Sequence, residues 1–328
     1  MTGKNELPFF SIILPTRNRP QLFRAALDSV LGQTFTELEV LVVNDGSSDE
    51  FLPSYQAMQA EYDERVKWHY QPQRPNGHGQ SYSMNTGAYH ARGEYITFLD
   101  DDDVWTDRDH LLRAHATIRA THAAPDVLYS NQTAFDSAGR EIPIKVWIAD
   151  LAEKVSPGML VADDAYQVST DFLLESAGFA HLNCTIIRRS LYLAMKGMDE
   201  NIRYECDRDF YLRVIDTADT LYYLPRHVAR HNVPDPKKKD NMSTLVSDLE
   251  KRLYQVNVLE KAVLLSQRQS VRTHAVAALA NTYKHMTSSL LAAGRFDVAA
   301  KHAKKALALR YTLKWHAYCA YLSLRGRF

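Results

Sequence analysis

The residues best suited to chemistry are four adjacent aspartates, Asp100 to Asp103, which follow the apolar run 94–99. Carboxylates this close repel one another when they are buried, so a folded site that keeps them requires a cation. Mg²⁺ or Mn²⁺ would satisfy them and leave room for substrate phosphates. In an extended segment Asp100 and Asp102 would share one face and could hold one ion. The competing structural interpretation is a solvated loop or a helix cap before Val104.

A second acidic group lies in the run 204–213, which contains three carboxylates before Arg213. Asp209 and Arg213 are four residues apart, so a helix would present both charges on one side. Taken alone, this run is explained by a helix start whose first turn carries capping carboxylates.

These residues must be positioned by the elements that precede them. The first hundred residues alternate short β-rich runs with amphipathic stretches, which is typical of a mostly parallel α/β sheet. Strands are predicted at 9–14, 39–43, 66–70, 94–99, 127–129 and 221–224, and helices from Pro20, at 81–91, after Asp107 and at 209–215. Polar residues follow three of these strands at their carboxyl ends, where open α/β sheets bind ligands. The stretch 142–179 fits no single element.

Residues 244–328 read as a separate, basic helical region. They hold 14 of the 39 Lys and Arg but 4 of the 39 Asp and Glu, so the remaining chain holds 25 basic and 35 acidic residues. The zero net charge is therefore a cancellation between two regions. A run from Gly294 through Ala299, Ala303 and Ala306 predicts an antiparallel helical pair, which matches half of a tetratricopeptide-type hairpin. Such helices could bind an anionic membrane surface or dock on an acidic domain of the same or a neighbouring subunit.

The composition excludes several classes of protein. With 328 residues, 45% hydrophobic and 24% charged, the chain is an ordinary globular protein. Cys184, Cys206 and Cys319 form no CxxC pair, which argues against a disulfide framework or a zinc site. The longest apolar stretches span about ten residues, whereas a membrane helix needs about 20. A cytoplasmic protein is expected, and no nucleic-acid partner.

Several motifs together resemble one family. The strings 11–19 (SIILPTRNR), 42–49 (VVNDGSSD), 85–87 (NTG) and 91–96 (ARGEYI) occur in the order found in the inverting family-2 glycosyltransferases, and Asp100–Asp103 fall where that family has its DXD motif. The resemblance covers about residues 8–243. It implies a GT-A fold, a Rossmann-like mostly parallel sheet, with a donor half at 1–105, an acceptor half at 106–243 and a helical extension at 244–328.

The resemblance also implies site residues. Pro15, Thr16 and Arg17 would line the nucleoside pocket, Asp45 would accept a hydrogen bond from the base, and Asp100 or Asp101 would face the ribose. Arg74 and Asn85 complete the implied donor contacts, and Asp102 with His231 would bind Mn²⁺ or Mg²⁺. Asp207 falls on the general base. Glu205 and Cys206 precede it on the acceptor side, and Cys206 stands where the family usually has Glu.

The implied reaction is inverting transfer of a sugar, expected to come from a UDP-sugar, to a hydroxyl of a saccharide or glycolipid acceptor. Surface polysaccharide or lipopolysaccharide synthesis is the expected setting. The basic helices would then contact the inner face of the cell membrane peripherally. Alternatively, they would join copies of the chain into a homo-oligomer.

Two other functions fit parts of the sequence. The string Asp100–Val104 also fits the DxDx[TV] pattern of haloacid-dehalogenase-like phosphatases, in which Asp100 would be the nucleophile and Asp102 the general acid. That motif normally follows the first strand, but three predicted strands precede it here. A non-catalytic nucleotide-sugar-binding protein is the other alternative. The sequence argues against a dinucleotide dehydrogenase, because no GxGxxG follows the first predicted strand.

Overall fold

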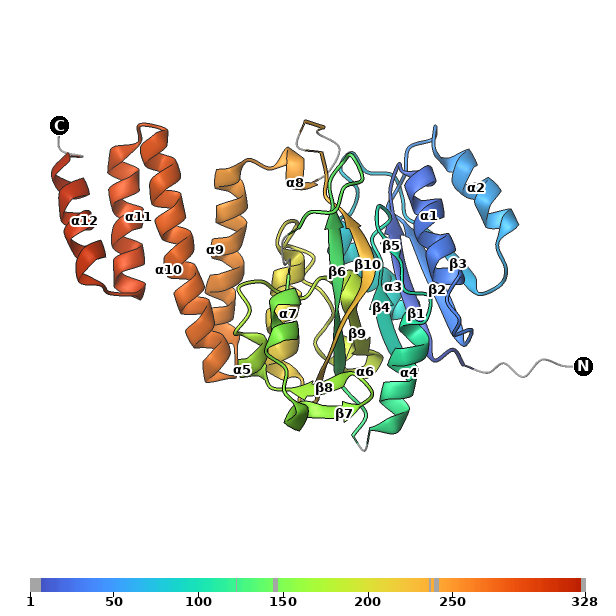
Figure 1. Cartoon of the computed structure of the whole chain (residues 1–328). Coiled ribbons are helices and arrows are strands. Elements are labelled where there is room, and N and C mark those ends of the chain that lie inside the picture. The colour runs from blue at the N-terminus through green and yellow to red at the C-terminus, as the bar shows by residue number, and fades with distance from the viewer. Residues whose placement is uncertain (1–6, 122, 144–146, 236, 239–241, 326–328) are drawn as a thin grey trace, which may run out of the picture. The chain divides into compact units, whose positions relative to one another are not determined.

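The structure, a computed structural model, describes residues 7–121, 123–143, 147–235, 237–238 and 242–325 (Figure 1). The chain divides into two compact units between Asp235 and Pro236. This division lies slightly before the boundary predicted at residue 243.

The first unit is built on one mixed sheet of ten strands. Its order is β3-β2-β1-β4-β9-β6-β10-β8-β7, with β5 paired to β10. Strands β3, β2, β1 and β4 are mutually parallel, and β9 runs antiparallel to both β4 and β6. The strands are β1 Phe10–Thr16, β2 Leu38–Asn44, β3 Val66–Tyr70, β4 Tyr95–Phe98, β5 Val104–Trp105, β6 Val127–Phe135, β7 Leu160–Ala162, β8 Ala165–Val168, β9 Thr185–Arg188 and β10 Leu221–Asn232.

Helices cover this sheet on both faces. They are α1 Pro20–Leu31, α2 Leu52–Glu61, α3 Gln80–His90, α4 His110–Ala120, α5 Thr170–Leu173, α6 Arg189–Ala194 and α7 Cys206–Thr217, with single 3₁₀ turns η1 Ala149–Glu153, η2 Pro157–Met159 and η3 Leu182–Cys184. The alternation of side chains along β1 divides the two layers. Ile12 and Leu14 join the core cluster that contains Phe23 of α1. Ile13 faces α3, where a Cβ on Gly87 would lie 2.5 Å from its Cγ2 atom. The predicted α/β class is confirmed.

The parallel strands bring their carboxyl ends together at one edge of the sheet. Strands β1 and β2 are buried along almost their whole length, as expected for strands covered on both faces. In register, Thr16 lies beside Asn44, and Ile13 lies beside Phe98. The loops that follow β1, β2 and β4 therefore start next to one another.

Strand β10 is longer than the sequence predicted. The prediction ended it at residue 224, but it continues to Asn232 because β6 runs beside it as far as Phe135. The pairing shifts register twice between Tyr223 and Ala229, which accommodates Pro225 within the strand. His231 consequently lies on the strand, not after it.

The second unit is helical. Its elements are α8 Met242–Leu245, α9 Asp248–Leu265, α10 Gln269–Ala292, α11 Phe296–Leu309 and α12 Leu313–Arg325. Helix α9 begins with a capping box between Ser247 and Glu250. Ala299, Ala303 and Ala306 of α11 are fully buried, and small side chains at this spacing let two helices approach closely. Helices α10 and α11 form the antiparallel pair that was predicted (Figure 1).

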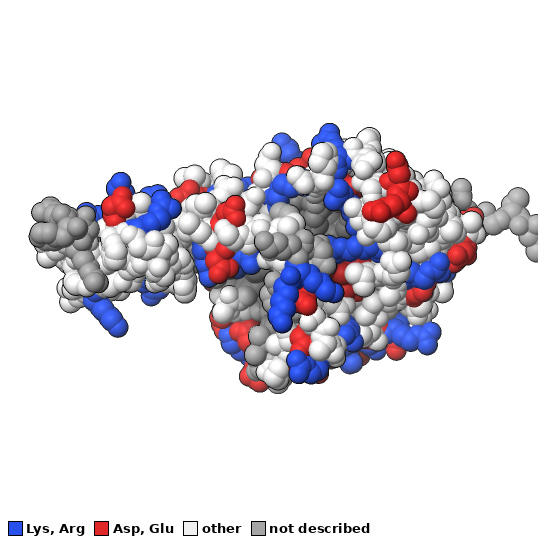
Figure 2. Space-filling view, turned by 90° about the horizontal axis from the view of Figure 1, so that it is seen from above, with Lys and Arg blue, Asp and Glu red and all other residues white. Residues whose placement is uncertain are grey.

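On the face drawn in Figure 2, described basic and acidic side chains are interspersed in both units. None of the helices in the described part of the chain combines the length and the apolarity that crossing a bilayer requires.

Candidate active site

The candidate site lies where the sheet changes direction. The chain runs outward from β1 to β2 and β3, then returns to place β4 on the other side of β1. At such a switch point the loops after the two central strands part and leave a crevice for ligands. The loop after β1 carries Arg17 and Arg19, and the loop after β4 carries the four aspartates.

The four aspartates form a tight turn, which differs from the extended segment that the sequence suggested. The backbone N–H of Asp103 donates to the carbonyl of Asp100 at 3.2 Å. The turn gathers three carboxylates where an extended segment would gather two, and oxygens of Asp100, Asp102 and Asp103 all lie within 4.8 Å of one another. These hard oxygen donors suit Mg²⁺ or Mn²⁺.

Asp103 is the member of this group that is hydrogen-bonded to β10 and to Asn183. It is fully buried, and Oδ2 accepts hydrogen bonds from Nδ2 of Asn183 at 2.5 Å and Nδ1 of His231 at 2.7 Å. Its Oδ1 accepts from the backbone N–H of Asn232 at 2.7 Å. Asp103 therefore fastens the turn to β10, and the partly exposed Asp100 and Asp102 are better placed to face a ligand.

The electrostatics of the turn favour a cation. Burial raises the pKa of Asp100 well above its usual range, and the Asp207 and Asp102 carboxylates raise it further. Burial, together with Asp103, also raises the pKa of Asp102, although Arg19 opposes the shift. Each ionised carboxylate disfavours ionisation of its neighbours, and a divalent ion bound between them would offset that repulsion.

Asp101 is turned toward β1. Its Oδ2 accepts from the hydroxyl of Thr16 at 2.8 Å and from the backbone N–H of Arg17 at 3.3 Å. The Thr16 hydroxyl also lies 2.8 Å from that of Tyr55 on α2. Two residues predicted to bind the donor, Thr16 and Asp101, are thus brought together. Pro15 directly precedes Thr16 in β1. Their contacts to a nucleoside stay a prediction.

The segment 74–79 is held by two other residues of the predicted donor site. Asp45 accepts from the backbone N–H groups of His78 and Gly79 at 2.8 and 3.0 Å, and its Oδ1 lies 2.9 Å from Nδ1 of His78. Arg17 donates to the carbonyls of Arg74 and Pro75, each at 3.1 Å. The Arg74 side chain is exposed at the same segment.

Asn85 uses its side chain within the protein. Its Nδ2 donates to the carbonyl of Met198 at 2.9 Å and to Glu200 at 2.8 Å. Its Oδ1 accepts from the Tyr192 hydroxyl at 2.7 Å and from the backbone N–H of Met198 at 2.8 Å. It is 3% exposed, so it ties α3 to the loop before α7, and the donor contact predicted for it stays untested.

Replacing Asn85 with Ala is expected to lower the free energy of unfolding by about 3 kcal/mol, because buried partners lose their hydrogen bonds. The control is Asn201→Ala, which removes an exposed amide whose Nδ2 donates to Oδ1 of Asp199 at 3.1 Å. Denaturant unfolding measures the difference. Wild-type stability combined with weaker nucleotide binding by the Asn85 variant would instead place its amide on the donor.

Asp207 lies in the first turn of α7, and its side chain is 17% exposed. Burial raises its pKa to about 6, although the Cys206 thiol donates to it and opposes the shift. Glu205 occupies the residue before the helix with a left-handed φ of 67° and pairs with Arg208 at 2.6 Å. The Cys206 sulfur lies 3.4 Å from Oε1 of Gln80 on α3. Glu205 and Cys206 precede Asp207 at the start of α7, and their acceptor contacts stay a prediction.

His181 is a site residue that the sequence reasoning missed. Its Nδ1 accepts from the backbone N–H of Asn183 at 3.3 Å, which leaves the proton of the neutral ring on Nε2. Burial lowers the pKa of His181 to about 3, so the ring is neutral at physiological pH. Nε2 lies 3.8 Å from Asp100 and 3.6 Å from Asp207, between the acidic turn and α7. An isolated histidine in the sequence gives no signal of this placement.

His231 and Trp147 complete this side of the site. The ring of His231 lies 4.8 Å from that of Trp147 and 5.1 Å from that of His181. Asp103 engages Nδ1 of His231, so Nε2 is the atom that could bind an ion. Burial lowers the pKa of His231, but the bond to Asp103 and the neighbouring carboxylates outweigh it and raise the pKa overall. Trp147 has a left-handed backbone, with φ of 55°, which is rare for a bulky residue and clusters at functional sites.

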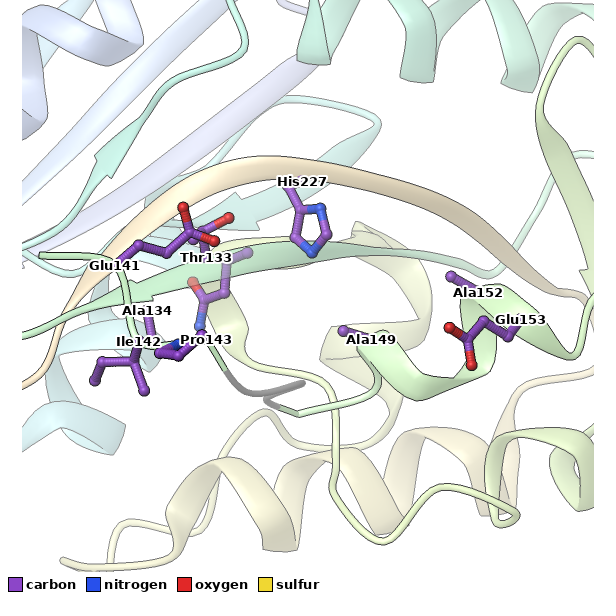
Figure 3. Close-up of a pocket in the computed structure, with 10 residues that line it drawn as sticks. Thr133, Ala134, Glu141, Ile142, Pro143, Ala149, Ala152, Glu153 and His227 are labelled. Carbon is purple, nitrogen blue, oxygen red and sulfur yellow. The ribbon is translucent and has the colours of Figure 1, made fainter.

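A cavity of about 370 Å³ opens on the acceptor half, in the region that the sequence left unassigned. Its walls are residues 132–134 of β6, residues 141–143, part of η1 and His227 of β10. In Figure 3, Glu141 and Glu153 lie at opposite ends of the cavity and His227 reaches into it from β10. Carboxylates and an imidazole are groups that can hydrogen-bond sugar hydroxyls.

The sequence was compared with known proteins. The family model described as glycosyl transferase family 2 matches residues 11–192. The chain is similar to the GalNAc(5)-diNAcBac-PP-undecaprenol beta-1,3-glucosyltransferase of Campylobacter jejuni, with 40% identity over 100 residues that cover 30% of each chain. It is also similar to the succinoglycan biosynthesis protein ExoW of Rhizobium meliloti, with 29% identity over 60% of this chain and 62% of that protein. The matches therefore span less than two thirds of these relatives.

Solved structures share the fold at low sequence identity. TarS of S. aureus in complex with UDP-GlcNAc is 19% identical with a TM-score of 0.61, covering 93% of this chain and 76% of that one. The mannosyltransferase PcManGT from Pyrobaculum calidifontis, in complex with GDP-Man and Mn²⁺, is 17% identical with a TM-score of 0.58, covering 99% and 88%.

Proposed function

The chain belongs to glycosyl transferase family 2, and we propose that it transfers a sugar from a nucleoside-diphosphate donor to an acceptor hydroxyl with inversion at the anomeric carbon. One observation carries the proposal. An acidic turn suited to a divalent ion and a buried carboxylate suited to a general base, Asp207, face each other across a neutral His181 at the ligand edge of the sheet.

We propose a UDP-sugar as the donor. Uracil offers an N3–H donor, and Asp45 is the carboxylate assigned to it. A carboxylate has about four acceptor sites, and Asp45 already accepts three bonds from residues 78–79, so capacity remains for one more. The solved relatives were crystallised with UDP-GlcNAc in one case and GDP-Man in the other, so the base needs a direct test.

We propose that Asp102, with Nε2 of His231, holds Mn²⁺ or Mg²⁺. The ion would act as a Lewis acid on the leaving diphosphate. Asp103 orients His231 through Nδ1, the arrangement in which a carboxylate fixes the ring of a metal-binding histidine. Asp100 offers a second carboxylate oxygen within 4.8 Å of that of Asp102.

Asp207 is the proposed general base. It takes the proton of the acceptor hydroxyl while that oxygen forms a bond to the anomeric carbon and the bond to the donor phosphate breaks on the opposite face. A pKa of about 6 keeps Asp207 ionised at neutral pH and close enough to that pH to act as a base. His181 presents Nε2–H toward this carboxylate, with Nε2 3.6 Å from Oδ2 of Asp207.

The proposed acceptor is a saccharide or glycolipid of a bacterial surface polysaccharide. The Campylobacter relative is named for an undecaprenol-linked glycan and the Rhizobium relative for succinoglycan synthesis. We place the acceptor over Glu205, Cys206 and the cavity of Figure 3, because these lie on the acceptor half. Peripheral binding to the inner face of the membrane, or self-association through 244–328, stays part of this proposal.

The comparisons do not favour the phosphatase interpretation. The acidic turn follows β4, the fourth strand along the chain, and the family match spans it. The non-catalytic alternative predicts donor binding without turnover.

The proposal is tested with the purified protein, Mn²⁺ and a panel of UDP- and GDP-sugars. One nucleotide sugar is expected to raise the melting temperature by several degrees, because a ligand that binds the folded state stabilises it. The same donor should give a transferred product of inverted anomeric configuration by NMR when glycan acceptors are added. Release of phosphate from an aryl phosphate, without any nucleotide-sugar effect, would favour the phosphatase.

A further inference from the structure

Arg19 places a guanidinium inside the acidic turn. Its Nη1 donates to Oδ2 of Asp102 at 2.8 Å and lies 3.3 Å from Oδ1 of Asp101. The side chains are 31% exposed for Arg19, 20% for Asp102 and 10% for Asp101. The pair is thus partly removed from water, where opposite charges attract more strongly than on an open surface.

The backbone of Arg19 is fixed while its side chain reaches across the site. Its N–H donates to the hydroxyl of Tyr55 at 3.0 Å, and its carbonyl accepts the N–H of Phe23 in the first turn of α1. Pro20 follows and starts that helix. A long side chain on a fixed backbone can exchange partners by rotation alone, without any movement of β1 or α1.

Arg19 and a divalent ion compete for the same carboxylate. Asp102 belongs to the group whose oxygens lie within 4.8 Å of one another, and its Oδ2 accepts from Nη1 of Arg19 at 2.8 Å. A cation bound there would repel the guanidinium and weaken its bond. The diphosphate of a donor would offer the displaced side chain a new anion, and arginine matches phosphate oxygens in geometry as well as charge.

We propose that Arg19 is a counter-ion of the acidic turn in the donor-free protein and becomes a phosphate contact when the ion and the donor bind. This inference rests on the proposed function. Ion binding and nucleotide binding would then be positively cooperative, because the ion releases Arg19 from Asp102 and the diphosphate binds the released guanidinium. Such coupling is reciprocal between the two ligands.

The test is Arg19→Met, which keeps the length of the side chain and removes its charge. Calorimetry measures the Kd of Mn²⁺ without nucleotide, and then the Kd of UDP, or of GDP if the donor panel selects guanosine, at saturating Mn²⁺. The expected result has opposite signs: Mn²⁺ binds about tenfold more tightly, and the nucleotide binds about tenfold more weakly. The matched control is Arg24→Met on α1, whose exposed pair with Glu61 lies away from the turn, and both Kd values should stay unchanged.

Several outcomes would overturn the inference. An unchanged Kd for either ligand would show that Arg19 does not pass from the carboxylate to the phosphate. Weaker binding of both ligands would show that Arg19 stabilises the loop after β1 instead. If the Met variant does not fold, Arg19→Gln is measured in the same way. If the unaltered protein bound neither Mn²⁺ nor any nucleotide, the proposed function would fail as well, whereas normal wild-type binding with equal values in the variant would remove this inference alone.

Discussion

Replacing Asp207 with Asn is expected to lower kcat by about 10²- to 10⁴-fold, the range that a positioned general base contributes. The amide keeps the size of the side chain but cannot accept the proton of the acceptor hydroxyl. Donor binding should stay within about threefold of the wild type, because Asp207 is assigned to the acceptor. Initial rates at saturating donor and acceptor, with the nucleotide Kd measured separately, distinguish the two effects.

The matched control is Asp171→Asn, which changes an exposed carboxylate in the first turn of another helix, α5. It should leave kcat unchanged. Near-wild-type turnover in the Asp207 variant would show that another group removes the proton.

The same assignment gives the sign of the pH dependence. Asp207 acts as a base when it is ionised, and burial raises its pKa to about 6. Activity should therefore fall about tenfold per pH unit below that value and level off above it. His181 is neutral throughout this range, while Glu205, His231 and Asp100 are the titratable neighbours that interact electrostatically with Asp207.

Replacing Asp102 with Ala is expected to remove the effect of Mn²⁺ on the protein. Without nucleotide, Mn²⁺ should raise the melting temperature of the wild type and not that of the variant, because the ion binds the folded state through this carboxylate. With donor and acceptor present, kcat/KM should fall more than about 100-fold. Chelation of the ion in the wild type should reproduce the loss, and added Mn²⁺ should reverse it.

Asp49→Ala is the control for this experiment, since it removes an exposed carboxylate from the loop after β2. It should respond to Mn²⁺ as the wild type does. A full Mn²⁺ effect in the Asp102 variant would move the ion to other ligands, such as Asp100 with Asp103.

Local sequence was sufficient for much of the fold. The predicted strand 66–70 coincides with β3, and the predicted strand 39–43 lies within β2. The run 39–43 is short and mostly apolar, and the run 66–70 alternates apolar with polar residues, so their structure depends mainly on their own pattern. Strand β10 extended beyond its prediction because its second half depends on hydrogen bonds from β6, which is about 90 residues away in the chain.

The candidate site likewise has features that the local sequence determines and features that depend on distant parts of the chain. The sequence alone determined that carboxylates follow β4 and begin α7, because their types and their places after apolar runs are visible without a structure. Tertiary structure decided how those carboxylates differ. The turn at 100–103 directs Asp101 to β1 and Asp103 to β10, while Asp100 and Asp102 remain partly exposed.

Tertiary structure also decided the neighbours that no pattern predicted. His181 comes to lie between Asp100 and Asp207, and Arg19 comes to lie on Asp102. The partners are 81 residues apart for His181 and Asp100, 83 for Arg19 and Asp102, and 26 for His181 and Asp207. A residue's type and spacing indicate which chemistry it can perform. Its pKa and its partners depend on burial and on charges brought from distant parts of the chain, and only the folded structure fixes these.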